Sequence, residues 1–274
     1  MPTRIKISLR GVSRTFVGRQ GERVEALRDI NFKVEDVYSD EGRDVGEFRV
    51  LLGPSGCGKS TILRLIAGLD RPDAGEVLVN GKHVTGPGAD RGMVFQKYTS
   101  FPWLTVGGNI EYGLRIRGTT PEKRRQTVAH LVEAVGLVGF ENAYPDALSG
   151  GMQQRLAIAR TLAVRPEVIL MDEPFGALDA QTRGGMQTLL LRIWEETAST
   201  ILFVTHDVEE AVYLADRLFI LSARPGTIVE DVPIPFGRPR DPAIKQSKAF
   251  QELEEYALAC LRRAPGSGQV RVSI

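Results

Sequence analysis

The alternation of apolar and polar residues in the first hundred positions predicts β-strands. In the stretch LRDINFKV the apolar residues Ile30, Phe32 and Val34 recur at every second position, which places them on one face of a strand. The mostly apolar stretch FRVLL, residues 48–52, is typical of a buried strand. An Asn-Gly pair at 80–81 predicts a tight hairpin, because these residue types tolerate the positive φ angles of such a turn.

Between about 107 and 165 the apolar spacing becomes helical. Thr120 and Pro121 suit the cap and first position of a helix, and Gly136 suits its end. The apolar residues between them recur at helical intervals: Val128, Leu131, Val132 and Val135. After position 165 the runs VILM and ILFVT predict two buried strands, each followed by a helix. This alternation predicts an α/β fold, a mainly parallel sheet covered by helices, with an inserted helical lobe.

Composition narrows the class of protein. The 274 residues include 35 basic and 34 acidic ones, so the net charge of +1 gives no electrostatic reason to expect nucleic acid as a partner. No apolar run approaches the roughly 18 residues of a membrane helix, and the N-terminal stretch MPTRIKISLR has no signal-peptide core. Two cysteines and three scattered histidines indicate neither a disulfide framework nor a zinc site. We expect a cytosolic protein that depends on another chain for any membrane span.

The stretch GPSGCGKS, residues 53–60, matches the phosphate-loop pattern G-x-x-x-x-G-K-[ST]. Its glycines let backbone N–H groups turn toward a phosphate, and the following helix adds the positive end of its dipole. Lys59 would reach the terminal phosphates, and the Ser60 hydroxyl suits Mg²⁺. A Gly-rich turn is the alternative, but the buried strand before the motif and the helix after it favour nucleotide binding. Cys57 needs only to be small and receives no redox role.

Polar residues follow three of the predicted strands. Gly53, Asp172 and His206 each come directly after one, and ligands bind at the carboxyl ends of strands in open α/β sheets. Asp172 suits a water-mediated contact to Mg²⁺, and Glu173 could polarise an attacking water. Taken alone, the two carboxylates suggest a solvated turn and His206 a packing residue. The phosphate loop makes a catalytic crevice the better interpretation.

The stretch LSGGMQQR, residues 148–155, is a second candidate for holding an anion. A small polar turn runs into the helix MQQRLAIARTLAV, whose first N–H groups and dipole favour negative charge. These residues alone do not decide whether the phosphate belongs to the same chain or to a partner.

Taken together, these motifs resemble the nucleotide-binding subunit of an ABC transporter, and the match covers nearly the whole chain. GPSGCGKST resembles the Walker A loop, VILMDEPFGALD the Walker B strand and D-loop, and LSGGMQQR the signature. VFQKY carries the Q-loop glutamine, Gln96, and His206 stands at the switch histidine. Phe16 falls where the family has an aromatic residue that stacks on adenine, although a lone Phe after a strand is more often core.

The resemblance implies a set of site residues. The catalytic ones are Glu173, as general base, His206 and Gln96, and the residues for Mg²⁺ are Ser60, Gln96 and Asp172. The residues that would bind ATP are Phe16, Gly53, Pro54, Ser55, Gly56, Cys57, Gly58, Lys59, Ser60, Thr61, Ser149, Gly150, Gly151 and Asp179. Because the family forms head-to-tail homodimers, Ser149, Gly150 and Gly151 would act on the nucleotide of the partner chain.

The resemblance also implies the domain organisation. We expect a P-loop NTPase core with an N-terminal antiparallel β part in an ABC ATPase domain spanning residues 1–240, with a helical subdomain at about 107–165. A Pro-rich linker, residues 232–242, would lead into a short helical tail at 241–274.

Two further stretches, SFPWLTVGGNI and RPGTIVEDVPIPFGRPR, resemble the nitrate, sulfonate and taurine importer group. This implies an ATP-hydrolysing subunit on the cytoplasmic side of the inner membrane, bound to integral permease subunits and served by an extracytoplasmic solute-binding protein. Gln96 and the segment 101–103 would relay nucleotide state to the permease. The alternatives are a lipid or export ATPase with other permeases, a soluble ABC ATPase acting on ribosomes or DNA, and a non-hydrolysing module. The single Walker A loop, the lack of long heptads and Glu173 disfavour the last two.

The segment EDVYSDEGRD, residues 35–44, departs from the family, which makes a brief turn here. Its five carboxylates predict an acidic, solvated hairpin extension, and a regulator contact is the alternative.

Overall fold

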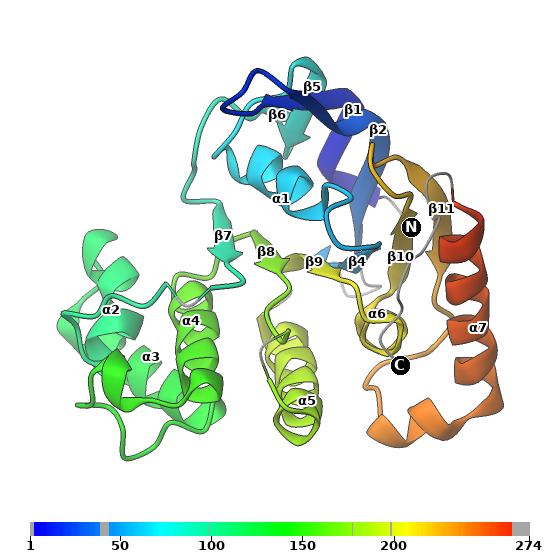
Figure 1. Cartoon of the computed structure of the whole chain (residues 1–274). Helices are drawn as coiled ribbons and strands as arrows, with labels where there is room; N and C mark the ends of the chain where they lie inside the picture. Colours follow the sequence, from blue (N-terminus) through cyan, green and yellow to red (C-terminus); the bar gives the residue numbers. More distant parts are fainter. Residues whose placement is uncertain (1–2, 39–43, 98, 177, 198, 265–274) are drawn as a thin grey trace.

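Two β-sheets form the framework of the computed structural model, which describes residues 3–38, 44–97, 99–176, 178–197 and 199–264 (Figure 1). The first sheet is antiparallel, in the order β3-β2-β1-β5-β6. Its strands are β1 (Thr3–Val17), β2 (Arg23–Tyr38), β3 (Asp44–Val45), β5 (Ala74–Val79) and β6 (Lys82–His83).

The second sheet has the order β11-β10-β4-β9-β8-β7, in which only β11 is antiparallel to its neighbour. Its strands are β4 (Phe48–Leu52), β7 (Arg91–Val94), β8 (Val168–Asp172), β9 (Thr200–Thr205), β10 (Arg217–Leu221) and β11 (Ile228–Pro233). Parallel neighbours need long crossovers, and helices supply them. The predicted α/β class, with an antiparallel N-terminal part and inserted helices, is confirmed.

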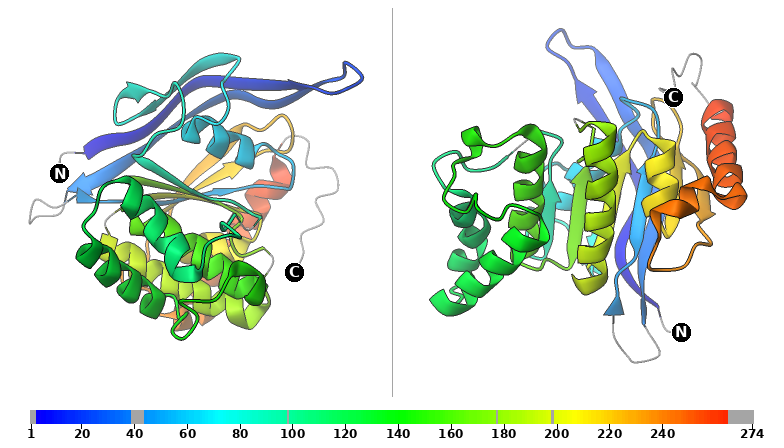
Figure 2. Two further views of the ribbon diagram at one scale, coloured as in Figure 1. Left: turned by 90° about the vertical axis from the view of Figure 1, so that its left-hand side faces the viewer. Right: turned by 90° about the horizontal axis from the view of Figure 1, so that it is seen from below.

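The helices fall into two groups. α2 (Val106–Ile116), α3 (Pro121–Ala134) and α4 (Gly150–Ala163) pack on one another beyond the edge strand β7 (Figures 1 and 2). The others cover the parallel sheet: α1 (Lys59–Ala67), α5 (Ala180–Thr197), α6 (Val208–Leu214) and α7 (Lys248–Arg263). Short 3₁₀ turns, η1 (Pro145–Ala147) and η2 (Pro242–Gln246), precede α4 and α7. Within the described residues, no helix has the length and apolarity required to cross a bilayer.

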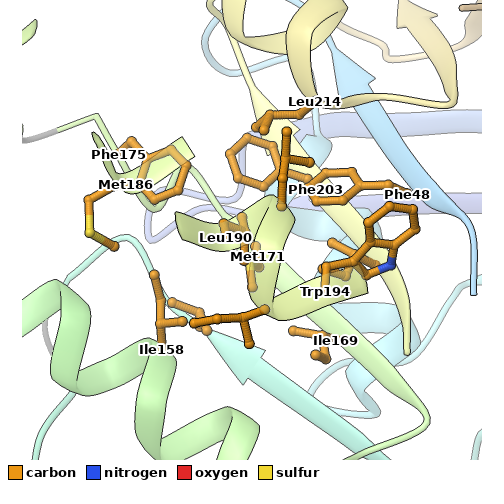
Figure 3. Packing of buried hydrophobic residues seen from close by; sticks show 14 of the residues in the cluster. Phe48, Ile158, Ile169, Met171, Phe175, Met186, Leu190, Trp194, Phe203 and Leu214 are labelled. Atoms are coloured by element: carbon orange, nitrogen blue, oxygen red, sulfur yellow. The ribbon is translucent and has the colours of Figure 1, made fainter. Parts of the chain in front are cut away.

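The parallel sheet separates two apolar cores. Along β4, Leu51 packs in the core that lies toward α1 and the antiparallel sheet, whereas Val50 and Leu52 pack in the core toward the other helices. Figure 3 shows part of the second core, where Phe48 and Trp194 meet edge to face with ring centroids 5.6 Å apart. Because both faces of these strands are buried, their sequences are apolar runs rather than alternating patterns.

The local patterns are confirmed in the structure. Ile30, Phe32 and Val34 are all buried on one face of β2. Asn80 and Gly81 have φ angles of 52° and 73° between β5 and β6, as a tight hairpin requires.

The prediction of a solvated acidic extension is wrong for Asp36. This residue is 1% exposed, lies 3.3 Å from Nζ of buried Lys6, and accepts a hydrogen bond from the hydroxyl of Thr200. β2 continues to Tyr38 and pairs with β1 as far as Thr3, so Asp36 faces the start of β9 instead of solvent. Residues 39–43 lie outside the described part of the chain.

The Pro-rich segment predicted as a linker packs against the core. The side chain of Arg240 is 0% exposed and donates a 2.7 Å hydrogen bond to the carbonyl of Tyr213 in the last turn of α6. A cation suits this end of a helix, where the carbonyls lack partners. α7 then buries Phe250 and Leu261 in the core toward the helices. Residues 265–274 of the predicted helical tail lie outside the described residues.

Candidate nucleotide site

The phosphate loop lies between β4 and α1. Gly56 and Gly58 have φ angles of 77° and 103°, and a Cβ at Gly58 would lie 2.5 Å from Leu27 and 2.8 Å from the carbonyl of Ala26. Only glycine therefore fits there. No side chain of the described residues caps α1 at Gly58. The first N–H groups of an uncapped helix can bind an anion.

Small residues are also required behind the loop. A Cβ at Gly53 would lie 2.8 Å from Sγ of Cys57, which is itself buried. Burial raises the pKa of the Cys57 thiol, so it stays protonated. This agrees with the interpretation of Cys57 as a small packing residue.

Lys59 and Ser60 begin α1 and point into the site. Nζ of Lys59 donates to the carbonyls of Gly53 and Pro54 at 2.8 and 3.0 Å. The Ser60 hydroxyl donates to Oδ1 of Asp172 at 2.8 Å. Burial raises the pKa of Asp172, and the Ser60 hydrogen bond opposes that rise. The Walker A serine and the Walker B aspartate, predicted to share a metal, are thus direct neighbours.

Three other predicted site residues lie around the carboxylate of Glu173. Its Oε2 lies 3.1 Å from Nδ1 of His206 and accepts a long 3.4 Å hydrogen bond from Nε2 of Gln96. Its Oε1 lies 3.7 Å from Nζ of Lys59. These side chains come from the ends of β7, β8 and β9 and from the start of α1, so the sheet edge gathers them as predicted.

The backbone of Glu173 is also unusual. Its φ angle is 43°, a conformation that non-glycine residues rarely adopt. Hydrogen bonds hold it there, since Glu173 N–H donates to the carbonyl of Val204 and its own carbonyl accepts from Gly176. Such strain is concentrated at functional sites, where it fixes the direction of a side chain.

A pocket of ≈ 320 Å³ joins the phosphate loop to the N-terminal sheet. Its lining includes Gln96 and Glu173 as well as Phe16, Val24 and Ala26 from β1 and β2. Phe16 is 38% exposed, and the guanidinium of Arg14 lies 4.8 Å from the centroid of its ring. Phe16 is therefore a pocket residue rather than a core residue, as the adenine interpretation requires.

The signature residues lie outside this pocket. Ser149 caps α4, and its hydroxyl accepts a hydrogen bond from Met152 N–H at 3.4 Å. Gly150 and Gly151 form the first turn of α4, and none of the three lines the pocket around Lys59. Asp179 is also outside, where it accepts from Thr182 N–H at 3.0 Å, and this bond lowers the pKa of its carboxyl.

Two arginines of the site were not predicted. Arg183 connects the D-loop to the segment that follows His206. It donates to the carbonyl of Leu178 and pairs with Asp207 at 3.2 Å. Arg224, after β10, lines the pocket itself. Neither belongs to a motif whose spacing predicts a contact, so only the folded chain identifies them.

Comparison with known proteins assigns the family. The family model described as ABC transporter matches residues 43–176. An ABC transporter ATP-binding protein of Methanocaldococcus jannaschii is 52% identical over 259 residues, which cover 94% of this chain and 92% of that protein. The chain belongs to the ATP-binding subunits of ABC transporters. Proteins of this family bind and hydrolyse ATP, which the phosphate loop and Glu173 suit.

Other relatives of this chain have names that state the solute they import. The nitrate import ATP-binding protein NrtD of Synechocystis sp. is 52% identical over 228 residues, 83% of this chain and 82% of that protein. The taurine import ATP-binding protein TauB of Pelagibacter ubique is 48% identical over 221 residues, 81% and 80% of the two chains. A solved dimeric ATP-binding cassette with bound ADP and Pi has a TM-score of 0.71, 32% identity, and covers 84% of this chain and 100% of its own.

Proposed function

We propose that this chain is the ATP-hydrolysing subunit of a membrane importer for a small anion-like solute such as nitrate, a sulfonate or taurine. The single observation that carries hydrolysis is the environment of Glu173, which contacts His206 and Gln96 through one oxygen and faces Lys59 with the other. The class of solute rests on the names of the nitrate and taurine import relatives.

In this proposal Glu173 is the general base. Its carboxylate orients a water molecule toward the terminal phosphate and accepts the proton that the water loses on attack. His206 fixes the orientation of that carboxylate through Nδ1, and Gln96 contacts the same oxygen. Lys59 leaves its loop carbonyls to bind the terminal phosphates, and Phe16 stacks on the adenine ring.

Mg²⁺ would be held by Ser60 and Asp172, with Gln96 beside them. It would neutralise charge on the phosphate oxygens. The described residues contain no group of three or more His, Cys, Asp or Glu side chains arranged to hold a metal. A hydroxyl and one carboxylate 2.8 Å apart suit Mg²⁺, which usually completes its coordination with substrate phosphates and waters.

We further propose a homodimer that closes around two nucleotides. The solved cassette relative is dimeric, and Ser149, Gly150 and Gly151 of this chain lie outside the pocket around Lys59. In a head-to-tail pair these three residues, together with Asp179, would contact the nucleotide of the partner.

The permease contact would lie next to the Q-loop. Trp103 is 69% exposed, and its ring packs on Phe101 with centroids 5.5 Å apart. Arg160 of α4 donates to the carbonyl of Thr99 at 2.6 Å and lies over the ring of Phe101, so the segment after Gln96 is attached to the signature helix. A shift of Gln96 would therefore move this exposed aromatic surface against a permease on the cytoplasmic side of the membrane.

The remaining parts of the proposal concern organisation. Residues 1–240 would form the ATPase domain, with its helical subdomain at about 107–165, and residues 241–274 a short tail. An extracytoplasmic solute-binding protein would deliver the solute.

The test is Mg²⁺-dependent ATP hydrolysis by the purified chain, followed by the same assay with its permease in liposomes. We expect turnover that Lys59→Ala abolishes and that Lys82→Ala, an exposed lysine on β6, preserves. Solute and its binding protein should stimulate the reconstituted complex, with nitrate, taurine and an alkanesulfonate compared. ATP hydrolysis that depends neither on Mg²⁺ nor on Lys59 would refute the ATPase proposal. A reconstituted complex whose ATP hydrolysis is stimulated by none of the three solutes would refute the importer proposal.

A further inference from the structure

The loop between β10 and β11 is held against the nucleotide pocket by backbone hydrogen bonds. Gly226 N–H donates to the carbonyl of Ala26 at 2.9 Å, and the Gly226 carbonyl accepts from Arg28 N–H at 3.0 Å. A Cβ at Gly226 would lie 2.1 Å from the carbonyl oxygen of Cys57, so this loop and the phosphate loop are in direct contact. Ser222 stiffens the turn, because its hydroxyl bonds to the carbonyl of Pro225 and the N–H of Thr227.

Because of this contact, Arg224 lies beside the phosphate loop. Its Nε donates a 3.1 Å hydrogen bond to the carbonyl of Gly56, and its Nη2 would lie 3.1 Å from a Cβ at that glycine. The side chain is exposed and lines the same pocket as Ser55, Lys59 and Phe16. The Gly56 bond uses one of the five N–H donors of the guanidinium, so four remain for a ligand.

The charge of Arg224 is not balanced within the described residues. Its guanidinium has the neutral Gly56 carbonyl as acceptor and has no carboxylate of the described chain within ion-pair distance. Arg14, Arg183 and Arg238, in contrast, each pair with an aspartate. An exposed cation fixed beside a phosphate loop is complementary to a polyphosphate.

We infer that Arg224 is a nucleotide-binding residue, whose guanidinium binds the phosphate chain as a second cation beside Lys59. The inference rests on the proposed function, since it requires ATP in this pocket. Lys59 comes from the phosphate loop itself, whereas Arg224 comes from a loop after β10, so the nucleotide would connect these two parts of the chain.

Equilibrium binding of a non-hydrolysable ATP analogue, ADP and adenosine to Arg224→Gln tests the inference. Glutamine can still donate to the Gly56 carbonyl but carries no charge. We expect the affinity for the ATP analogue and ADP to fall about tenfold, the usual value of a charge-assisted hydrogen bond, with adenosine unchanged. Arg224→Lys should recover part of the loss. The matched control is Arg217→Gln on β10, which pairs with Asp231 outside the pocket and should bind like wild type.

Three outcomes separate the inference from the function on which it rests. Equal affinity of Arg224→Gln and wild type for the ATP analogue would overturn the inference. An equal loss for the ATP analogue and adenosine would also overturn it, because Arg224 would then only shape the loop. A wild-type chain that binds no ATP analogue, or binds it as well after Lys59→Ala, would instead refute the proposed ATP site.

Discussion

Nδ1 of His206 and Oε2 of Glu173 lie 3.1 Å apart, although 33 residues separate them in the sequence. The contact joins the ends of two neighbouring parallel strands, β8 and β9, and it fixes which way the Glu173 carboxylate faces.

The first prediction concerns the basicity of Glu173. Glu173→Gln keeps the size of the side chain and its contacts with His206 and Gln96 but removes the proton acceptor. We expect ATP hydrolysis to fall by about two to four orders of magnitude while ATP binding persists and ATP stabilises a dimer. Steady-state turnover measures the first effect, equilibrium binding of ATP the second, and light scattering with ATP the third. Glu252→Gln, on an exposed turn of α7, is the control. Wild-type turnover in Glu173→Gln would exclude the base role.

The second prediction concerns the signature residues. Lys59→Ala and Ser149→Arg should each be inactive, the second because a guanidinium crowds the phosphate position. In a head-to-tail mixed dimer one site collects both defects, and the other combines an intact Lys59 with an intact Ser149. Mixing should therefore restore ATP hydrolysis that neither variant shows alone.

Two measurements accompany the mixing experiment. Since Ser149 caps α4, thermal unfolding must show that Ser149→Arg is folded. Light scattering must show that the mixed variants form dimers. This measurement is needed because an enzyme that requires two intact sites would remain inactive even in a mixed dimer. Monomers throughout, with no rescue, contradict the partner-chain role.

The third prediction concerns the buried ion pair of Asp36. Among the described residues, Asp36→Ala leaves buried Lys6 with the more exposed Glu167 as its remaining ion-pair partner, so the free energy of unfolding should fall by about 3 kcal/mol. Glu35→Gln is the control, because this neighbouring side chain is only half-buried, and it should change stability by less than about 0.5 kcal/mol. Denaturant unfolding measures both. Equal stabilities for the two variants would show that Asp36 is not part of the core.

The fourth prediction concerns pH. Burial raises the pKa of Glu210 from its ordinary value of 4.5 to about 7, and nearby Asp207 adds to the rise, whereas Thr205, Gln187 and Arg183 oppose it. The folded state therefore holds this proton more tightly than the unfolded state, and the Glu210 contribution to stability is lost as pH rises from about 4.5 to 7. Glu210→Gln, which has no proton to lose, should be more stable than wild type at pH 8 by up to about 3 kcal/mol.

Thermal or denaturant unfolding at pH 5, 6, 7 and 8 measures the Glu210 contribution. The difference between wild type and Glu210→Gln cancels other titrating groups such as Asp172, whose pKa is also raised by burial. The prediction is wrong if the two proteins show parallel stability curves across this range.

Sequence patterns predicted the elements whose stability comes from local chemistry. The alternation on β2 and the Asn-Gly turn each depend on neighbours within a few residues, and each was confirmed. The crevice around Glu173 was predictable for a related reason. Its groups follow directly after strands, and parallel strands place their carboxyl ends on one edge of a sheet.

Long-range contacts decided the rest. Asp36 belongs to an acidic stretch that predicted solvent, yet its partner Thr200 lies 164 residues away. The sequence predicted that Arg240 lies in a linker, but its guanidinium donates to the carbonyl of Tyr213 in the last turn of α6, 27 residues earlier.

The sequence by itself determined the fold class and the phosphate-loop motif. It also predicted that Lys59, Asp172, Glu173 and His206 share one crevice, because motif spacing and strand ends encode this locally. Only the tertiary structure decided that Arg224 contacts Gly56, 168 residues earlier in the chain. The physical reason is that such a contact depends on how two sheets and a distant loop pack together. Hydrophobic periodicity sets which face of an element is buried, but it does not specify which distant polar group that face meets.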